Sequence, residues 1–181
     1  MECFRRALKI EPNCPYAHHG LARMLGGKGD IAGEIEHYEL AAKYAPTAAE
    51  PQYSLGLILS EQGREDEAIA HYEEALRLMP RLYQAHGNLG LIFANRKQWD
   101  QALTHVRRAI ELAPSDPIGH FSLGEVLQAQ GNFTEAKTAF RRALELLPES
   151  NTRRAEVEQK LKDCQQRLDG ADAGKEPSGK K

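Results

Sequence analysis

The sequence contains only three cysteines, and they form neither a metal-ligand pattern nor a disulfide pattern. Cys3, Cys14 and Cys164 are widely separated, and no two of them have the short spacing of zinc ligands. Because three isolated thiols cannot build a disulfide framework or a zinc site by themselves, we expect a reducing compartment.

Long hydrophobic runs are also lacking. No stretch approaches the roughly 18 consecutive apolar residues of a membrane-spanning helix, and the first residues lack the apolar core of a signal peptide. We therefore predict a cytoplasmic chain that does not insert into a membrane. A signal or anchor in an upstream region would change that localisation.

The chain has no excess of charge of one sign. It carries 24 Lys and Arg residues against 26 Asp and Glu residues, with a formal net charge of -2. The clearest basic groups are the pairs Arg107–Arg108 and Arg141–Arg142, and Glu111 and Glu145 follow the first arginine of each pair by four residues. Opposite charges at this helical spacing offset each other, so we predict no nucleic-acid partner.

Catalytic motifs are missing as well. There is no glycine-rich phosphate loop before a helix, no HExxH motif, and no nucleophile flanked by a base. Six histidines fall into two columns of the repeat described next: His37, His71 and His105, and His18, His86 and His120. Members of one column belong to different repeat units, too far apart to bind one metal ion. The sequence therefore predicts no enzyme activity, no cofactor and no metal site.

What the sequence does contain is a strict internal repeat of 34 residues. Prolines keep this interval at Pro12, Pro46, Pro80, Pro114 and Pro148. Alanines keep it at Ala7, Ala41, Ala75, Ala109 and Ala143. A fixed interval without insertions indicates an array of similar structural units.

Each unit has the pattern of two helices. In residues 53–80, apolar residues recur at helical spacing on both sides of Gly63. Gly29, Gly63 and Gly131 share this position between the helices, which favours a left-handed turn. Small residues are expected where the two helices pack closely: Gly56, Gly90 and Gly124 in the first helices, and Ala68, Ala102 and Ala136 in the second.

These columns resemble the tetratricopeptide repeat (TPR) family over residues 1–150. The resemblance rests on a Leu-Gly pair in the first helix, an alanine that opens the second, an aromatic residue four positions later, and Ala then Pro at its end. It implies an all-α fold: a right-handed α–α superhelix of antiparallel helix pairs. The first helices would line a concave groove that binds peptide segments of other proteins.

The repeat also predicts the organisation of the chain. Residues 1–14 would hold the second helix of an incomplete repeat, and the four complete repeats would span 15–48, 49–82, 83–116 and 117–150. In residues 151–169, Val157, Leu161, Cys164 and Leu168 share one helical face, so we expect a capping helix there. Gly170 would end it, and residues 170–181 have the composition of a disordered tail.

The resemblance places ten residues in the concave groove: Tyr16, His19, Arg23, Tyr53, Leu57, Asn88, Leu91, Ile118, Phe121 and Glu125. This mostly apolar and aromatic set predicts a protein or peptide partner with an apolar or amphipathic segment. Only Asn88 matches the carboxylate clamp of TPR domains that bind heat-shock chaperones, and the asparagine ladder of TPR regions attached to O-linked glycosyltransferases is missing. A non-catalytic interaction module, a scaffold or adaptor, is the leading hypothesis.

The chain opens inside its own repeat, because MECFRRALKIEPN corresponds to a second helix. Phe4, Ala7 and Leu8 would then lack their usual partner helix. We expect the chain to be the C-terminal part of a longer TPR protein. Two alternatives stay open: an arm that regulates, or presents substrate to, an upstream enzyme domain such as a glycosyltransferase, and a homodimer or oligomeric scaffold formed through these three residues.

Glu34 and Lys97 are among the positions that depart from the repeat. Glu34 stands in the column of small alanines, and because an unpaired buried carboxylate is costly, we expect it to turn to solvent while Gly33 makes the close contact. Lys97 replaces the turn glycine of its unit, which would cost about 1 kcal/mol in the left-handed conformation.

Overall fold

The structure, a computed structural model, describes residues 1–173, with side chains placed through Gly170. The described chain is entirely helical, in agreement with the predicted all-α class. Its helices are α1 (Glu2–Ile10), α2 (Pro15–Gly26), α3 (Ile31–Tyr44), α4 (Ala49–Glu61), α5 (Glu65–Leu78), α6 (Tyr83–Asn95), α7 (Trp99–Leu112), α8 (Pro117–Ala129), α9 (Phe133–Leu146) and α10 (Arg154–Ala173). Of the expected disordered tail, residues 174–181 lie outside the described residues.

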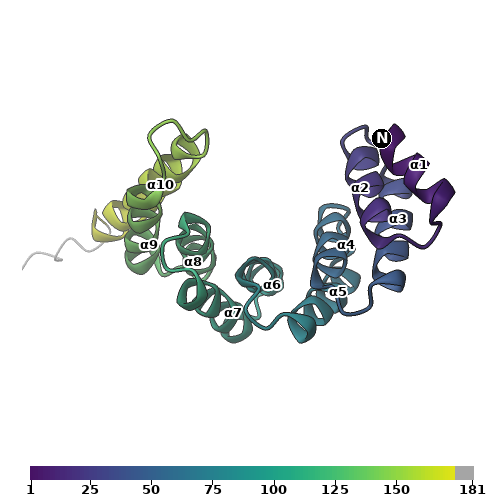
Figure 1. Cartoon of the computed structure of the whole chain (residues 1–181). Helices are drawn as coiled ribbons and strands as arrows, with labels where there is room; N and C mark the ends of the chain where they lie inside the picture. Colours follow the sequence, from purple (N-terminus) through teal and green to yellow (C-terminus); the bar gives the residue numbers. More distant parts are fainter. Residues whose placement is uncertain (174–181) are drawn as a thin grey trace, which may run out of the picture. The chain divides into compact units, whose positions relative to one another are not determined.

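The chain divides into two compact units, Met1–Ala85 and His86–Lys181. The first contains α1 to α5, and the second contains most of α6 and α7 to α10 (Figure 1). Within each unit, consecutive helices pack as hairpins: α2 with α3, α4 with α5, and α8 with α9.

The turns inside the hairpins have the predicted left-handed backbone. Gly29, Gly63 and Gly131 have φ angles of 80, 72 and 85°. Lys97 occupies the equivalent position with a φ of 58°. Because its Cβ crowds the backbone in this region, Lys97 carries a local strain that the three glycines avoid.

We expect Lys97→Gly to raise the free energy of unfolding by about 1 kcal/mol, because the replacement removes this strain. Gly131→Lys is the matched reverse change: a Cβ there meets no atom within 4 Å, so only the backbone conformation opposes it. Urea unfolding followed by circular dichroism measures both. A loss of stability in Lys97→Gly would contradict the account.

The helix-interior glycines make room for large buried side chains. A Cβ added at Gly56 would lie 2.7 Å from the ring of Tyr72, and one added at Gly124 would lie 2.5 Å from the ring of Phe140. Both rings are almost completely buried. In the α4–α5 and α8–α9 hairpins, the first helix therefore packs directly against the aromatic residue of the second, which explains why glycine stands there.

The prediction for Glu34 is wrong. Its side chain is half-buried between α2 and α3, and its carboxyl group fills the space beside Gly26, where any Cβ would overlap it. Burial raises the pKa of Glu34, and the nearby Glu61 raises it further. Gly26 has no side chain, so it leaves space for the carboxyl group. The other half of the expectation holds, because a Cβ at Gly33 would lie 3.1 Å from Leu25.

Helix α10 packs on α9, as expected of a capping helix. Val157 and Cys164 are buried against Phe140 and its neighbours. Arg154 donates hydrogen bonds to the carbonyl oxygens of Leu144 and Leu147, at 3.1 and 2.8 Å, and so satisfies the end of α9.

The expected end of α10 at Gly170 is wrong, because the helix continues to Ala173. A glycine inside a helix costs about 1 kcal/mol but does not by itself stop it. Gly170 is not among the residues with positive φ, so it does not form the left-handed turn that often ends a helix at glycine.

Helix α1 packs on α2 (Figure 1). The Phe4 ring of α1 contacts Gly20 of α2. Phe4, Ala7 and Leu8 are each half-buried. Ile10, at the end of α1, is 87% exposed. The three residues proposed as an oligomer face therefore already bury part of their surface within the chain.

Candidate peptide-binding surface

In the first unit, five predicted groove residues lie on α2 and α4: Tyr16, His19, Arg23, Tyr53 and Leu57. Tyr16 and Arg23 are exposed, Tyr16 at 84%, and the other three are half-buried. The rings of His19 and Tyr53 lie 5.2 and 5.8 Å, centroid to centroid, from the buried rings of Tyr38 and Tyr72. The second helices thus pack against these two predicted groove side chains.

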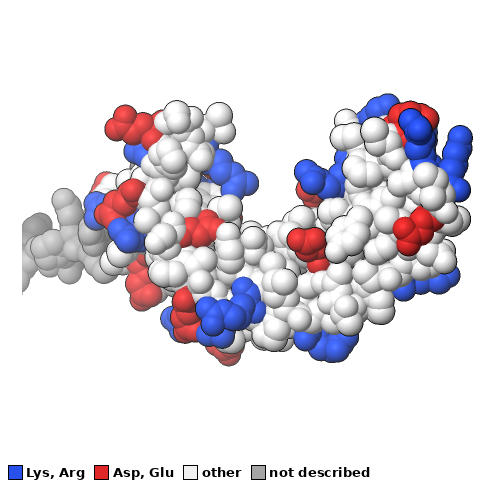
Figure 2. Space-filling model, in the orientation of Figure 1, with Lys and Arg blue, Asp and Glu red and all other residues white. Residues whose placement is uncertain are grey.

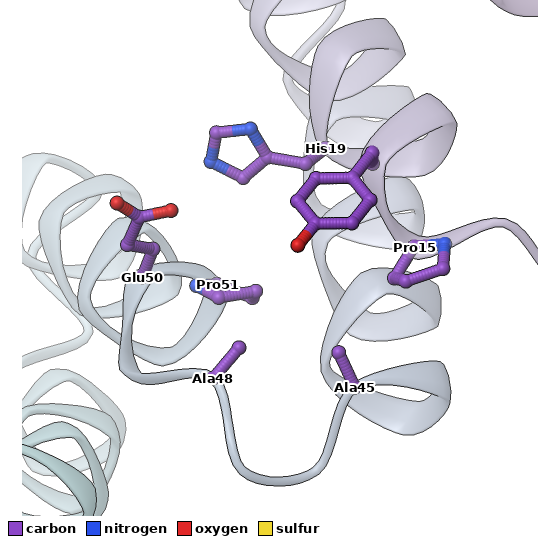
Figure 3. A pocket seen from close by; sticks show the side chains of 7 residues that line it. Pro15, His19, Ala45, Ala48, Glu50 and Pro51 are labelled. Carbon is purple, nitrogen blue, oxygen red and sulfur yellow. The ribbon is translucent and has the colours of Figure 1, made fainter.

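A pocket of about 140 Å³ opens between α2 and α4 beside Tyr16. Its lining consists of Pro15, Tyr16, His19, Ala45, Ala48, Glu50 and Pro51. Figure 3 shows that the alanines and prolines surround the space, while Glu50 of α4 faces His19 of α2. Glu50 provides the pocket's carboxylate.

The pKa of His19 is affected by burial and by two charged neighbours. Burial lowers its pKa most, Glu50 raises it, and Arg23 lowers it. The lowered pKa favours the neutral, polar form of the His19 ring.

In the second unit, the remaining predicted residues lie on α6 and α8: Asn88, Leu91, Ile118, Phe121 and Glu125. Ile118 is 51% exposed, and the other four are half-buried. The Phe121 ring lies 5.7 Å from that of Phe140, which repeats the support seen for Tyr53.

The capping helix contributes to this part of the surface. Lys160 of α10 forms a salt bridge of 3.1 Å with Glu125 of α8. Both residues line a cavity of about 480 Å³ together with Leu91, Ala94, Asn95, Gln128 and Ala129. Lys160 is not among the predicted groove residues, because residues 151–169 were expected to form only a cap. Its position four residues before Cys164 on an amphipathic helix was the available signal.

The arginine pairs belong to local ion pairs. Arg108 contacts Glu111 at 2.9 Å and Arg142 contacts Glu145 at 2.7 Å. The predicted pairing of the first arginine with a glutamate four residues on is therefore wrong: the second arginine pairs, at a spacing of three. Figure 2 shows acidic and basic side chains intermixed on the face in view, with no continuous basic stripe within either unit.

The structure contains two histidine pairs that the 34-residue repeat pattern did not indicate. Nδ1 of His18 lies 3.0 Å from Nδ1 of His37, and Nδ1 of His86 lies 3.0 Å from Nδ1 of His105. In the hairpin between them, His71 pairs with Gln52, Nδ1 to Oε1 at 2.7 Å. All three pairs are separated by 19 residues, the interval that an antiparallel hairpin of this repeat brings together.

Within residues 1–173, no three histidine, cysteine or acidic side chains come together as a metal site would require. No helix in that part of the chain is both long and apolar enough to cross a membrane.

The fold and its surface define a class of protein: a helical-repeat protein built from antiparallel hairpins, with partly exposed apolar side chains on the first helices. The sequence profile of the tetratricopeptide repeat matches residues 35–82, 53–117 and 117–150. Because these matches cover more than half of the chain, it belongs to the tetratricopeptide repeat family. This confirms the predicted TPR solenoid.

Solved structures of TPR proteins share the fold. MamA has a TM-score of 0.69 at 24% identity, with 79% of this chain and 84% of MamA covered. YrrB, described as a TPR protein with an unusual peptide-binding site, has a TM-score of 0.70 at 22% identity, covering 93% and 97%. TTC0263, a thermophilic TPR protein from Thermus thermophilus, has a TM-score of 0.72 at 24% identity, covering 90% and 87%. No curated protein matches the sequence.

Proposed function

We propose that this chain is a non-catalytic protein-protein interaction module that holds a peptide segment of a partner protein against the first helices of its repeats. Family membership supports the class of function, and the description of the structurally similar YrrB supports a peptide as the ligand. The observation that carries the proposal is the exposure of large apolar side chains, Tyr16 at 84% and Ile118 at 51%, on first helices.

Supported aromatic side chains suit such a surface. Tyr53 and Phe121 lie half-buried against Tyr72 and Phe140, so little side-chain freedom remains to be lost when a ligand arrives. Peptide affinity comes mainly from a few such anchors, and polar neighbours such as Asn88 set the register.

The two alternatives receive less support. A dimer through Phe4, Ala7 and Leu8 would have to use surface that is already partly buried. An arm that serves an upstream enzyme domain would use the same groove, so it differs from the proposal in its partner and not in its binding surface. Cytoplasmic localisation remains a prediction.

The test uses the complete chain as bait for a displayed library of random peptides of about a dozen residues. We expect Tyr53→Glu, Leu57→Glu, Leu91→Glu to weaken the selected peptides at least about tenfold, because charges replace apolar contacts. Circular dichroism checks that the variant keeps its helicity.

A matched control places three glutamates on exposed positions of second helices, Ala32→Glu, Ala70→Glu and Thr104→Glu. The control should bind like the original chain. If both variants bind equally well, or if no peptide is selected, the groove is not the working surface.

A further inference from the structure

The pocket beside Tyr16 has the chemistry of a site for one basic side chain. Its walls are the apolar surfaces of Pro15, Ala45, Ala48 and Pro51. The carboxylate of Glu50 lies at the edge of the pocket, on the side of His19 (Figure 3). Tyr16 adds an aromatic ring that is 84% exposed and therefore free to contact a ligand. The volume of about 140 Å³ suits a single side chain and excludes a folded element.

Charge decides which kind of side chain fits. Lysine and arginine lay their aliphatic stems along apolar surfaces while the charged end reaches a polar group, and their cations are attracted to aromatic rings. The proline and alanine walls can receive the stem, and Glu50 and Tyr16 can receive the cation. Arg23 lowers the pKa of His19 but is not part of the pocket lining.

An acidic ligand is disfavoured although a helix begins here. The N-terminus of a helix attracts negative charge, and α4 begins at Ala49. Glu50 lies in the first turn of α4, so the chain already supplies a negative charge there. A second carboxylate in the pocket would face Glu50 and be repelled.

We infer that the first unit binds its peptide through a lysine or arginine side chain seated between Tyr16 and Glu50. This inference rests on the proposed function and specifies it: the ligand is a basic, amphipathic segment of a partner protein. An exposed ion pair between the ligand's cation and Glu50, together with its cation–π contact with Tyr16, corresponds to about a three- to tenfold gain in peptide affinity.

The test continues the peptide selection with the complete chain. Selected peptides should contain a recurring lysine or arginine, and its replacement by acetyllysine or citrulline should weaken binding about three- to tenfold. In the variant Glu50→Gln the same replacement should weaken binding less than in the original chain, because only the cation–π contact with Tyr16 is then lost. Glu73→Gln, which removes an exposed carboxylate outside the pocket, should behave like the original chain.

The outcomes separate the two proposals. Peptides that depend on the groove but need no basic residue, or whose basic residue matters equally in Glu50→Gln, overturn this inference and leave the proposed function standing. Peptides whose binding is unchanged in the groove variant, or a failure to select any peptide, contradict the proposed function and this inference with it.

Discussion

Gly124→Ala is expected to lower the free energy of unfolding by about 1–3 kcal/mol, although the same change usually stabilises a helix. The added methyl carbon would lie 2.5 Å from the ring of Phe140, which is fully buried and cannot move aside without disturbing the core. Urea unfolding followed by circular dichroism measures the change.

Gly87→Ala provides the control. Gly87 also lies inside a helix, but its new Cβ would meet no atom within 4 Å. Here the lower entropy of the unfolded alanine chain should raise stability by about 0.5–1 kcal/mol. If both variants gain stability, the ring of Phe140 does not need the space that the glycine provides.

Acid is expected to destabilise the fold below neutral pH through its histidine pairs. Burial lowers the pKa of His37 and His105, and the partners His18 and His86 lower each further, while Glu36 and Asp30 raise that of His37. Because the folded state favours the neutral rings, the unfolded state binds more protons. Stability is complete above the ordinary pKa of about 6.5 and falls as the pH drops below it.

The hydrogen-bond pattern explains why a pair is more sensitive than a single ring. Nε2 of His18 lies 2.9 Å from the carbonyl oxygen of Pro12 and donates to it, so its Nδ1 accepts from Nδ1–H of His37. Two imidazolium rings at 3.0 Å would repel each other, so the folded pair resists a second proton that the unfolded chain accepts freely.

The variant His18→Gln, His86→Gln tests this, because the natural Gln52–His71 pair shows that glutamine fits the position. The free energy of unfolding should fall less between pH 7.5 and 5 in the variant than in the original chain. The carboxylates are the same in both proteins, so they cancel in the comparison. An equal or larger loss in the variant would contradict the role of the pairs.

The repeat pattern predicted most of the fold because one 34-residue interval sets both helices of every hairpin. The left-handed turns followed from glycine, and even the strained Lys97 could be located from its column. Residues of one repeat column lie 34 positions apart, so the repeat pattern did not indicate contacts between residues of different columns. The His18–His37 pair depends on how the two helices of a hairpin face each other, which is a spacing of 19 residues and not of 34.

The errors have local physical causes. Glu34 stays between α2 and α3 because Gly26 leaves space for its carboxyl group. The two residues belong to different columns of the repeat, so the repeat pattern did not indicate that they meet. Helix α10 passes Gly170 because an interior glycine weakens a helix without stopping it. The pocket beside Tyr16 combines α2, the end of the first hairpin and the start of α4, so no single segment of the sequence indicated it.

The central claim is that peptides bind on the first helices of the repeats. The most direct measurement is an amide chemical-shift map of the complete chain during titration with a selected peptide. We expect shifts concentrated on α2 and α4 in the first unit and on α6 and α8 in the second. Shifts concentrated on α3, α5, α7 and α9, or on α1, would contradict it.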